Sequence, residues 1–235
     1  MKLKVAVILI ILALFIPAIA RAQSTEKLGF EFWQAQYQMG DLVDNRFDAR
    51  ELSGELDVQS DVTMKLSYQF WDQAKGSNNK LENFTLDTVK DFASAEDEQL
   101  AVGLGLDYYQ QTTKTEKLDL SQLKKKSLDL VLDIEKNIME RVGIFAEMKY
   151  GLYNDYNFFN QHLDSELSYD SNYNYSIKAG LDFKVGSNLR ANLGYKLSQE
   201  SLERSNGQST TINSYDLSKF SQLQQGLFLG LETRF

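Results

Sequence analysis

The sequence predicts an all-β chain in which about ten antiparallel strands close an up-and-down transmembrane β-barrel, with roughly eight to twelve strands as the range. Apolar residues alternate with polar or small ones over most of the chain, which is the period of a β-strand. The only proline lies within residues 1–22, so the rest of the chain suits unbroken ladders of paired strands. No later segment is apolar over the ~20 residues that a spanning helix needs, so the chain crosses a membrane as a barrel or not at all.

The first 22 residues have the pattern of a cleaved secretory signal peptide. Lys2 and Lys4 precede an apolar run over 5–19, and small residues ending at Ala22 follow it. The apolar run is too short for a membrane anchor. Cleavage after Ala22 leaves 23–235 as a single barrel domain. The chain contains no cysteine, which excludes both an acyl anchor on cysteine and disulfide bridges.

The exported chain is acidic. Loss of Lys2, Lys4 and Arg21 with the signal leaves 22 basic and 33 acidic residues, a formal charge of −11. This balance argues against nucleic acid as a partner.

The last fifteen residues, 221–235, alternate most clearly. Leu227, Leu229, Leu231 and the terminal Phe235 share one face, while the other face is mostly polar or small. This segment resembles the C-terminal strand of bacterial outer-membrane β-barrel proteins, in which a final aromatic residue and alternating apolar residues form the assembly signal. The resemblance implies insertion by the barrel-assembly machinery, an outer-membrane location, and both chain ends on the periplasmic side.

Alternation and Gly- or Asn-bearing turns place the other strands in order. In the first, Trp33, Ala35, Tyr37 and Met39 form the face that we assign to lipid. Three hairpins follow the same rule. The predicted strands are 29–39, 51–58, 62–70, 81–92, 100–108, 128–134, 142–152, 173–185, 189–197 and 223–235.

The segment 81–92 is needed to make the number of strands even, as periplasmic chain ends require. Phe84, Leu86 and Phe92 share its apolar face with Lys90, and a charge facing mid-lipid costs ~2–4 kcal/mol. A β-bulge or a position near the membrane interface would explain Lys90.

Long outer loops are then expected at 40–49, 72–80, 111–125, 153–171 and 200–220. Aromatic residues should gather at the two membrane interfaces. An outer girdle is predicted from Tyr37, Tyr68, Phe70, Tyr108, Tyr150, Tyr173, Tyr175 and Tyr195, and a thinner inner one from Phe92, Phe183 and Phe235. A soluble lipocalin-like barrel or a β-sandwich also alternates, but the terminal aromatic strand and the polar opposite phase argue against it.

The polar phase should line a narrow lumen. Hairpin geometry sets Glu55 against Lys65 and Asp129 against Lys149, which are opposite-charge pairs worth ~0.2–1 kcal/mol each. The hairpin 173–197 instead sets Lys184 against Arg190 and Lys178 against Lys196. Carboxylates that can answer these like charges across the lumen are Asp57, Asp133, Glu135, Glu147, Asp182 and Glu232.

Two interpretations of this basic strip remain. In one, salt bridges close a structural barrel; in the other, the strip lines a narrow, porin-like passive channel for small polar solutes or ions. We favour the closed barrel, because a narrow barrel must fill or hydrate its interior. A third hypothesis makes the barrel the membrane anchor of a larger envelope assembly.

Catalysis has little support in the sequence. A surface hydrolase, protease or lipid-acting enzyme would need His162 as a base, and the nearby Asp164 and Ser165 lie in the same loop without a second motif. One histidine, no cysteine and irregularly spaced acids predict no metal site and no cofactor.

Two outer segments invite binding hypotheses. Lysines cluster at 114–126, where an outer position predicts contact with lipopolysaccharide phosphates; they are Lys114, Lys117, Lys124, Lys125 and Lys126. The aromatic segment 153–171 is expected either to fold into the barrel mouth or to bind a partner.

Overall fold

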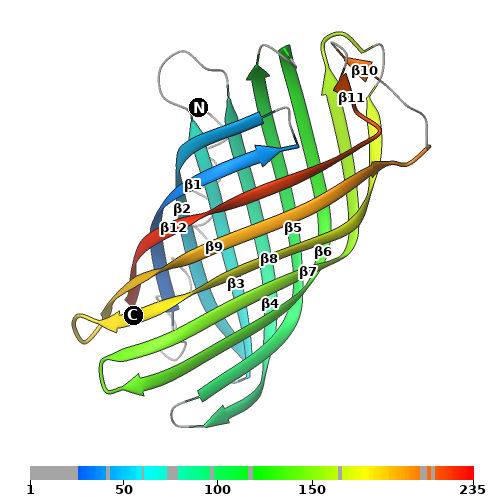
Figure 1. Ribbon diagram of the computed structural model, residues 1–235. Coiled ribbons are helices and arrows are strands. Elements are labelled where there is room, and N and C mark those ends of the chain that lie inside the picture. The colour runs from blue at the N-terminus through cyan, green and yellow to red at the C-terminus, as the bar shows by residue number, and fades with distance from the viewer. Residues whose placement is uncertain are drawn as a thin grey trace.

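The alternating segments form a closed antiparallel barrel, as the sequence predicts (Figure 1). The structure is a computed structural model that describes residues 26–40, 43–59, 61–72, 79–95, 98–115, 119–163, 166–206, 211–212 and 215–235; the predicted signal peptide lies outside them. Within these ranges no helix is long and apolar enough to cross a membrane.

The described strands are β1 (Glu26–Met39), β2 (Val43–Gln59), β3 (Val62–Asp72), β4 (Lys80–Ala95), β5 (Glu98–Thr115), β6 (Asp119–Met139), β7 (Val142–Asn160), β8 (Leu167–Lys184), β9 (Leu189–Arg204), β10 (Thr211–Ile212), β11 (Tyr215–Asp216) and β12 (Lys219–Arg234). Ten of them close the barrel in the order β1-β12-β9-β8-β7-β6-β5-β4-β3-β2, and β10 pairs with β11 alone. The tenth predicted strand, 81–92, is confirmed as part of β4.

The first and last strands close the barrel. β1 and β12 pair antiparallel, with Phe30 opposite Leu231 and Phe32 opposite Leu229. The barrel end that holds Glu26 and Phe235 is called the terminal end here, and the opposite one the far end. The barrel halves next to them are the terminal half and the far half.

The polarity of the two faces inverts along β1. In the terminal half, Phe30 and Phe32 point outward and Glu31 is buried inside; in the far half, Trp33 and Tyr37 are buried inside. The prediction that Trp33, Ala35, Tyr37 and Met39 face lipid is therefore wrong. Side chains still alternate at every residue, but the apolar set changes face between positions 32 and 33.

Other strands repeat this inversion. In β2, Leu52 and Leu56 alternate with Glu51 and Glu55 in the terminal half, where the two glutamates line the interior. Farther along the strand, Phe47 and Ala49 are buried while Arg46, Asp48 and Arg50 are exposed. A surface that is apolar outside and polar inside suits lipid, and the reverse suits water.

This inversion explains why four of the five expected long loops are mostly strand. β2 begins at Val43, β5 continues to Thr115, β7 continues to Asn160 and β9 continues to Arg204. The polar residues that suggested loops are outward-facing strand residues in the far half. β6 has 21 residues, about twice the ~9–11 that a spanning strand needs.

A core of buried, mostly apolar side chains fills the far half. Phe47 stacks on Trp71 with ring centroids 3.6 Å apart, and Tyr169 packs edge-on against Phe220. The Tyr169 hydroxyl also donates a hydrogen bond to the Leu217 carbonyl at 2.8 Å. The buried members of this far-half core are Trp33, Ala35, Tyr37, Met39, Val43, Phe47, Ala49, Trp71, Leu81, Tyr109, Leu123, Tyr156, Phe158, Leu167, Tyr169, Leu202, Leu217, Phe220 and Phe228.

Two glycines make room for the rings of this core that lie nearest the terminal half. A Cβ on Gly194 would lie 2.2 Å from the Ala179 carbonyl oxygen and 2.7 Å from Cζ of Phe228. One on Gly226 would lie 2.0 Å from the Gln34 carbonyl oxygen and 2.8 Å from Nε1 of Trp33, so both glycines also allow close approach of the neighbouring strand. All these distances are below van der Waals contact. The alternation of glycine with apolar residues in β9 and β12 therefore admits large rings where the polar and apolar halves meet.

The outer surface carries part of the predicted aromatic girdles. Tyr108, Tyr150, Tyr173 and Tyr195 of the outer girdle are exposed, as are Phe92, Phe183 and Phe235 of the inner one. Phe70 and Tyr175 are half-buried and Tyr68 is buried, while the assignment of Tyr37 to the girdle is wrong because it lies in the far-half core. Lys90 is exposed near the terminal end, where its Nζ lies 3.1 Å from Asp61 and the register shifts between Asp91 and Ala93. The expected bulge thus accompanies Lys90.

Candidate functional site

The terminal half encloses a polar chamber of about 470 Å³. Its lining extends from residues near the terminal end, such as Lys136 and Asn137, up to Trp33 and Tyr109 of the far-half core. Thirteen acidic and eight basic side chains contribute to it, a formal balance of −5. The chamber is the candidate site because it combines free volume with convergent charges.

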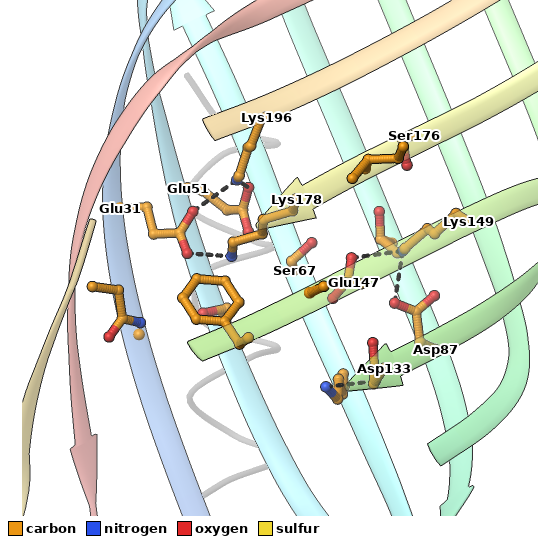
Figure 2. A pocket seen from close by; sticks show the side chains of 18 of the residues that line it. Glu31, Glu51, Ser67, Asp87, Asp133, Glu147, Lys149, Ser176, Lys178 and Lys196 are labelled. Carbon is orange, nitrogen blue, oxygen red and sulfur yellow. Dashed lines mark hydrogen bonds and ion pairs between the residues drawn. The ribbon is translucent and has the colours of Figure 1, made fainter. Parts of the chain in front are cut away.

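The basic strip of β8 and β9 meets a carboxylate from β1 (Figure 2). Lys178 and Lys196 are directly opposite in the ladder, as the hairpin register predicts. Glu31 forms ion pairs with both of them, at 2.7 Å to Lys196 Nζ. Lys196 Nζ also lies 2.5 Å from Glu51 Oε2. The opposed lysines are therefore bridged by one buried glutamate.

The two lysines also contact the aromatic rings of the far-half core that border the chamber. Lys178 Nζ is 5.2 Å from the ring centroid of Phe228, and Lys196 Nζ is 5.5 Å from the rings of both Phe228 and Trp33. These are cation–π distances. The charged chamber and the far-half core thus meet at the rings of Phe228 and Trp33, whose faces contact the two lysine ammonium groups.

Near the terminal end, basic residues pair with carboxylates of the same strand or of the neighbouring one. Lys184 stands opposite Arg190, as predicted. Arg190 pairs with Asp182 of the neighbouring strand, while Lys184 is exposed at the end of β8. Glu232 binds Arg234 of its own strand, with Nε 3.0 Å from Oε1.

A second ion cluster joins β1, β2, β3 and β6. Glu55 is opposite Lys65, the pair that the hairpin predicts, although their atoms are 3.7 Å apart. Lys65 lies closer to Asp133, at 2.8 Å, and Lys27 lies 2.8 Å from Glu55. Lys27 also approaches Glu135 at 3.8 Å.

The predicted pairing of Asp129 with Lys149 is wrong. The β6–β7 ladder sets Lys149 opposite Val131 and Asp129 opposite Gly151. Lys149 Nζ instead lies 2.6 Å from Asp87 Oδ2, 3.9 Å from Asp107 and 4.0 Å from Glu147. Asp129 accepts a hydrogen bond from Ser127 at 3.1 Å.

Six carboxylates of the chamber lining were not singled out from the sequence: Glu31, Glu51, Asp87, Glu98, Asp107 and Glu200. Glu31 was missed because its strand was assigned the opposite face. Glu51 and Asp87 lie in the expected polar phase of their strands, and only the closed barrel brings them to Lys196 and Lys149. The polar phase of a strand therefore identifies residues that face the interior, but not their partners across the barrel.

The predicted lysine cluster does not form one surface. Lys125 is buried inside the far half, where its Nζ lies 2.6 Å from Glu200 Oε1 and 5.8 Å from the Tyr156 ring centroid. Lys125 is therefore corrected from a lipopolysaccharide contact to an interior residue. Lys114 and Lys126 are exposed, and Lys124 is partly exposed with Glu166 3.8 Å away. Lys117 lies outside the described residues.

His162 is exposed beyond the end of β7. Its backbone N–H donates to Asn160 Oδ1 at 2.9 Å, and its ring lies 3.3 Å from the Gln161 amide. Asp164 and Ser165, considered as its catalytic partners, lie outside the described residues. Within the described part of the chain, no three His, Cys, Asp or Glu side chains are placed to hold a metal ion.

The aromatic segment 153–171 proves to be mainly the far halves of β7 and β8. Tyr156 and Phe158 enter the far-half core rather than forming a loop over the mouth. Leu227, Leu229, Leu231 and Phe235, predicted to form an assembly signal, are all exposed on the outer surface of the terminal half.

Comparisons with known proteins identify the fold and no family. No family model matches the chain, and no curated protein matches it. Among solved structures, the outer membrane protease OmpT of Escherichia coli aligns with a TM-score of 0.57 and 12% identity over 90% of this chain and 96% of that one.

Two further barrels are less similar. The translocator domain of the autotransporter NalP of Neisseria meningitidis aligns with a TM-score of 0.46 and 10% identity over 99% of this chain and 98% of that one. Neisserial surface protein A aligns with a TM-score of 0.41 and 11% identity over 90% and 97%. The closed ladder and the alignment with OmpT show that the chain has the antiparallel β-barrel fold of bacterial outer-membrane proteins.

Proposed function

We propose that the chain is an integral outer-membrane barrel that is closed along its axis, with a polar chamber open toward the periplasm. The observation that carries this proposal is the far-half core, to which all ten barrel strands or their ends contribute buried side chains. Lipid surrounds the apolar outer surface of the terminal half, and the far half projects into water outside the cell.

Ion passage along the axis would require water to enter this core. Trp71, Tyr37, Tyr156, Tyr169 and Phe158 are among its fully buried side chains. Burying such a side chain contributes roughly 1.5–3 kcal/mol, so hydrating several together costs far more than thermal energy supplies. The barrel is therefore a structural element of the membrane rather than a passive channel.

Planar-bilayer recording tests the closure. The refolded protein, shown to be folded by its heat-modifiable gel mobility, should add no steady conductance above that of the bare bilayer. An ohmic conductance that scales with the number of inserted barrels would contradict the proposal.

The exposed lysines favour a second, compatible role in binding lipopolysaccharide. Lys124 and Lys126 precede Leu128 and Leu130 on the outer face of β6, toward the far end, so they stand where the apolar surface gives way to the polar one. Cations at that height suit the phosphates of the outer leaflet. Co-purified lipopolysaccharide should fall on replacement of Lys124 and Lys126 by Gln, and unchanged retention would refute the contact.

A further inference from the structure

The ladder between β7 and β8 is interrupted in its middle. The strands pair from Val142 with Phe183 up to Tyr150 with Tyr175, and again from Tyr156 with Tyr169 onward. Between these blocks, the described segments 151–155 and 170–174 form no ladder pairs with each other. The register is the same on both sides, so the strands separate and rejoin.

Opposed bulges explain the separation. β7 has one extra residue relative to β6 beside Leu128 and Asp129, and β8 has one extra residue relative to β9 between Ser171 and Tyr173. Each bulge bends its strand locally. Because the two bulges face each other across the same pair of strands, the wall parts there without a change of register.

Two asparagines occupy the interruption. Asn174, which is buried, donates a hydrogen bond from Nδ2 to Asn154 Oδ1 at 2.7 Å. Gly151 gives these amides their space, since a Cβ there would lie 2.6 Å from Asn154 Nδ2 and 2.8 Å from Asn174 Nδ2. The segment is therefore held together by a side-chain hydrogen bond in place of backbone pairs.

The interruption lies between the tyrosine girdle and the chamber. Tyr150, Tyr153 and Tyr173 are exposed around it, at 53%, 64% and 37%. Gly151 and Asn174 belong to the chamber lining. Since exposed tyrosines mark the headgroup level of a bilayer, the chamber reaches the wall at that height.

On the chamber side of the interruption, buried hydrogen-bond acceptors outnumber the donors that reach them. Asp129, opposite Gly151 and 2% exposed, has no hydrogen-bond partner for Oδ1 among the described residues, and the same holds for Oδ1 of Asp87, 4% exposed. Two lysines act on this group of carboxylates: Lys149 lies among Asp87, Asp107 and Glu147, and Lys125 acts on Asp107 and Asp129 as well as on Glu200. The carboxylates still outnumber the lysines. Unpartnered buried carboxylate oxygens favour a ligand that brings both donors and positive charge.

We propose that the interruption between β7 and β8 is a lateral port, latched by Asn154 and Asn174, that takes the ammonium-bearing headgroup of a membrane amphiphile toward Asp129. The proposal rests on the membrane placement of the proposed function. Tyr153 and Tyr173 flank the acyl chains, and the headgroup exchanges the asparagine hydrogen bond for bonds to Asp129 and the freed amides.

Lipid retention in native mass spectrometry tests the port. The folded protein is exposed to mixed micelles containing equal phosphatidylethanolamine and phosphatidylcholine with identical acyl chains, which differ in having or lacking ammonium donors. The ethanolamine lipid should be retained about tenfold more, the effect of one or two charge-assisted hydrogen bonds. Asp129→Asn should remove this preference while leaving the shape of the site.

Matched variants separate the port from general lipid binding. Gln225→Leu removes the acceptor for the Tyr195 hydroxyl, 3.0 Å away, in the fully paired β9–β12 wall, and should keep the preference. Equal retention of the two lipids, or a preference that survives Asp129→Asn, would overturn the proposal. Competition by soluble phosphoethanolamine at the affinity of the lipid would also overturn it, because the ligand would then enter through the chamber mouth.

Failure of the port and failure of closure are distinguishable. A silent barrel without lipid preference would refute the port alone, and a conducting barrel that retains the ethanolamine lipid would refute closure alone.

Discussion

Replacing Glu31 by Gln should destabilise the barrel, because this one carboxylate bridges two lysines that stand opposite each other. Glu31 has a side-chain exposure of 6%, against 21% for Lys178 and 12% for Lys196. Loss of one partner from a buried ion pair costs ~3–5 kcal/mol. Lys196 keeps Glu51 and Lys178 keeps some water, so the lower end of that range, about 3 kcal/mol, is expected.

Equilibrium unfolding in urea measures this loss. With a denaturant slope of ~1–3 kcal/mol per molar, the midpoint should fall by about 1.5 M. The matched control is Glu98→Gln, which removes a carboxylate from the exposed pair with Lys136 and should cost ~0–1 kcal/mol. The double variant Glu31→Gln/Lys178→Gln should recover part of the loss, since one unanswered charge is gone. A Glu31→Gln midpoint equal to that of Glu98→Gln would refute the reasoning.

Three further substitutions test the different environments of the two barrel halves. Trp71→Ala, which removes the ring stacked on Phe47, should cost ~3–5 kcal/mol in urea unfolding, and a loss under ~1 kcal/mol would mean that the far-half core is loose. Leu229→Arg on the lipid face should cost ~2–4 kcal/mol in vesicles; no loss would place this residue away from mid-lipid. Lys125→Gln, which leaves Glu200 buried without its cation, should lower stability by ~3 kcal/mol while Lys126→Gln leaves it within ~0.5 kcal/mol; equal effects would contradict the assignment of Lys125 to the interior.

Much of the fold follows from residue alternation. The strands, the closing pair of β1 and β12, and the opposition of Lys178 and Lys196 depend on local patterns and tight turns. The face of β1 did not follow from them, because alternation shows which residues share a face and not whether that face meets lipid or a core. When a strand leaves the membrane, the apolar face becomes the inner one.

The register of β6 and β7 failed for a different reason. β6 continues to Met139, which pairs with Val142, so the turn is shorter than expected and Lys149 meets Val131 rather than Asp129. Bulges shift the ladder again beside Leu128. Contacts across the barrel, such as Lys149 with Asp87, depend on closure and have no local sequence signal.

The central claim is that the far-half core, rather than the ion pairs of the chamber, seals the barrel. Planar-bilayer conductance of three folded proteins tests it: the wild type, Lys178→Gln/Lys196→Gln, and Trp33→Ala/Phe228→Ala, which removes two core rings that border the chamber. The account predicts silence from the first two and conductance from the third, with cation preference from the chamber's formal balance of −5. Steady conductance by the wild type, or by the lysine variant while the core variant stays silent, would contradict it.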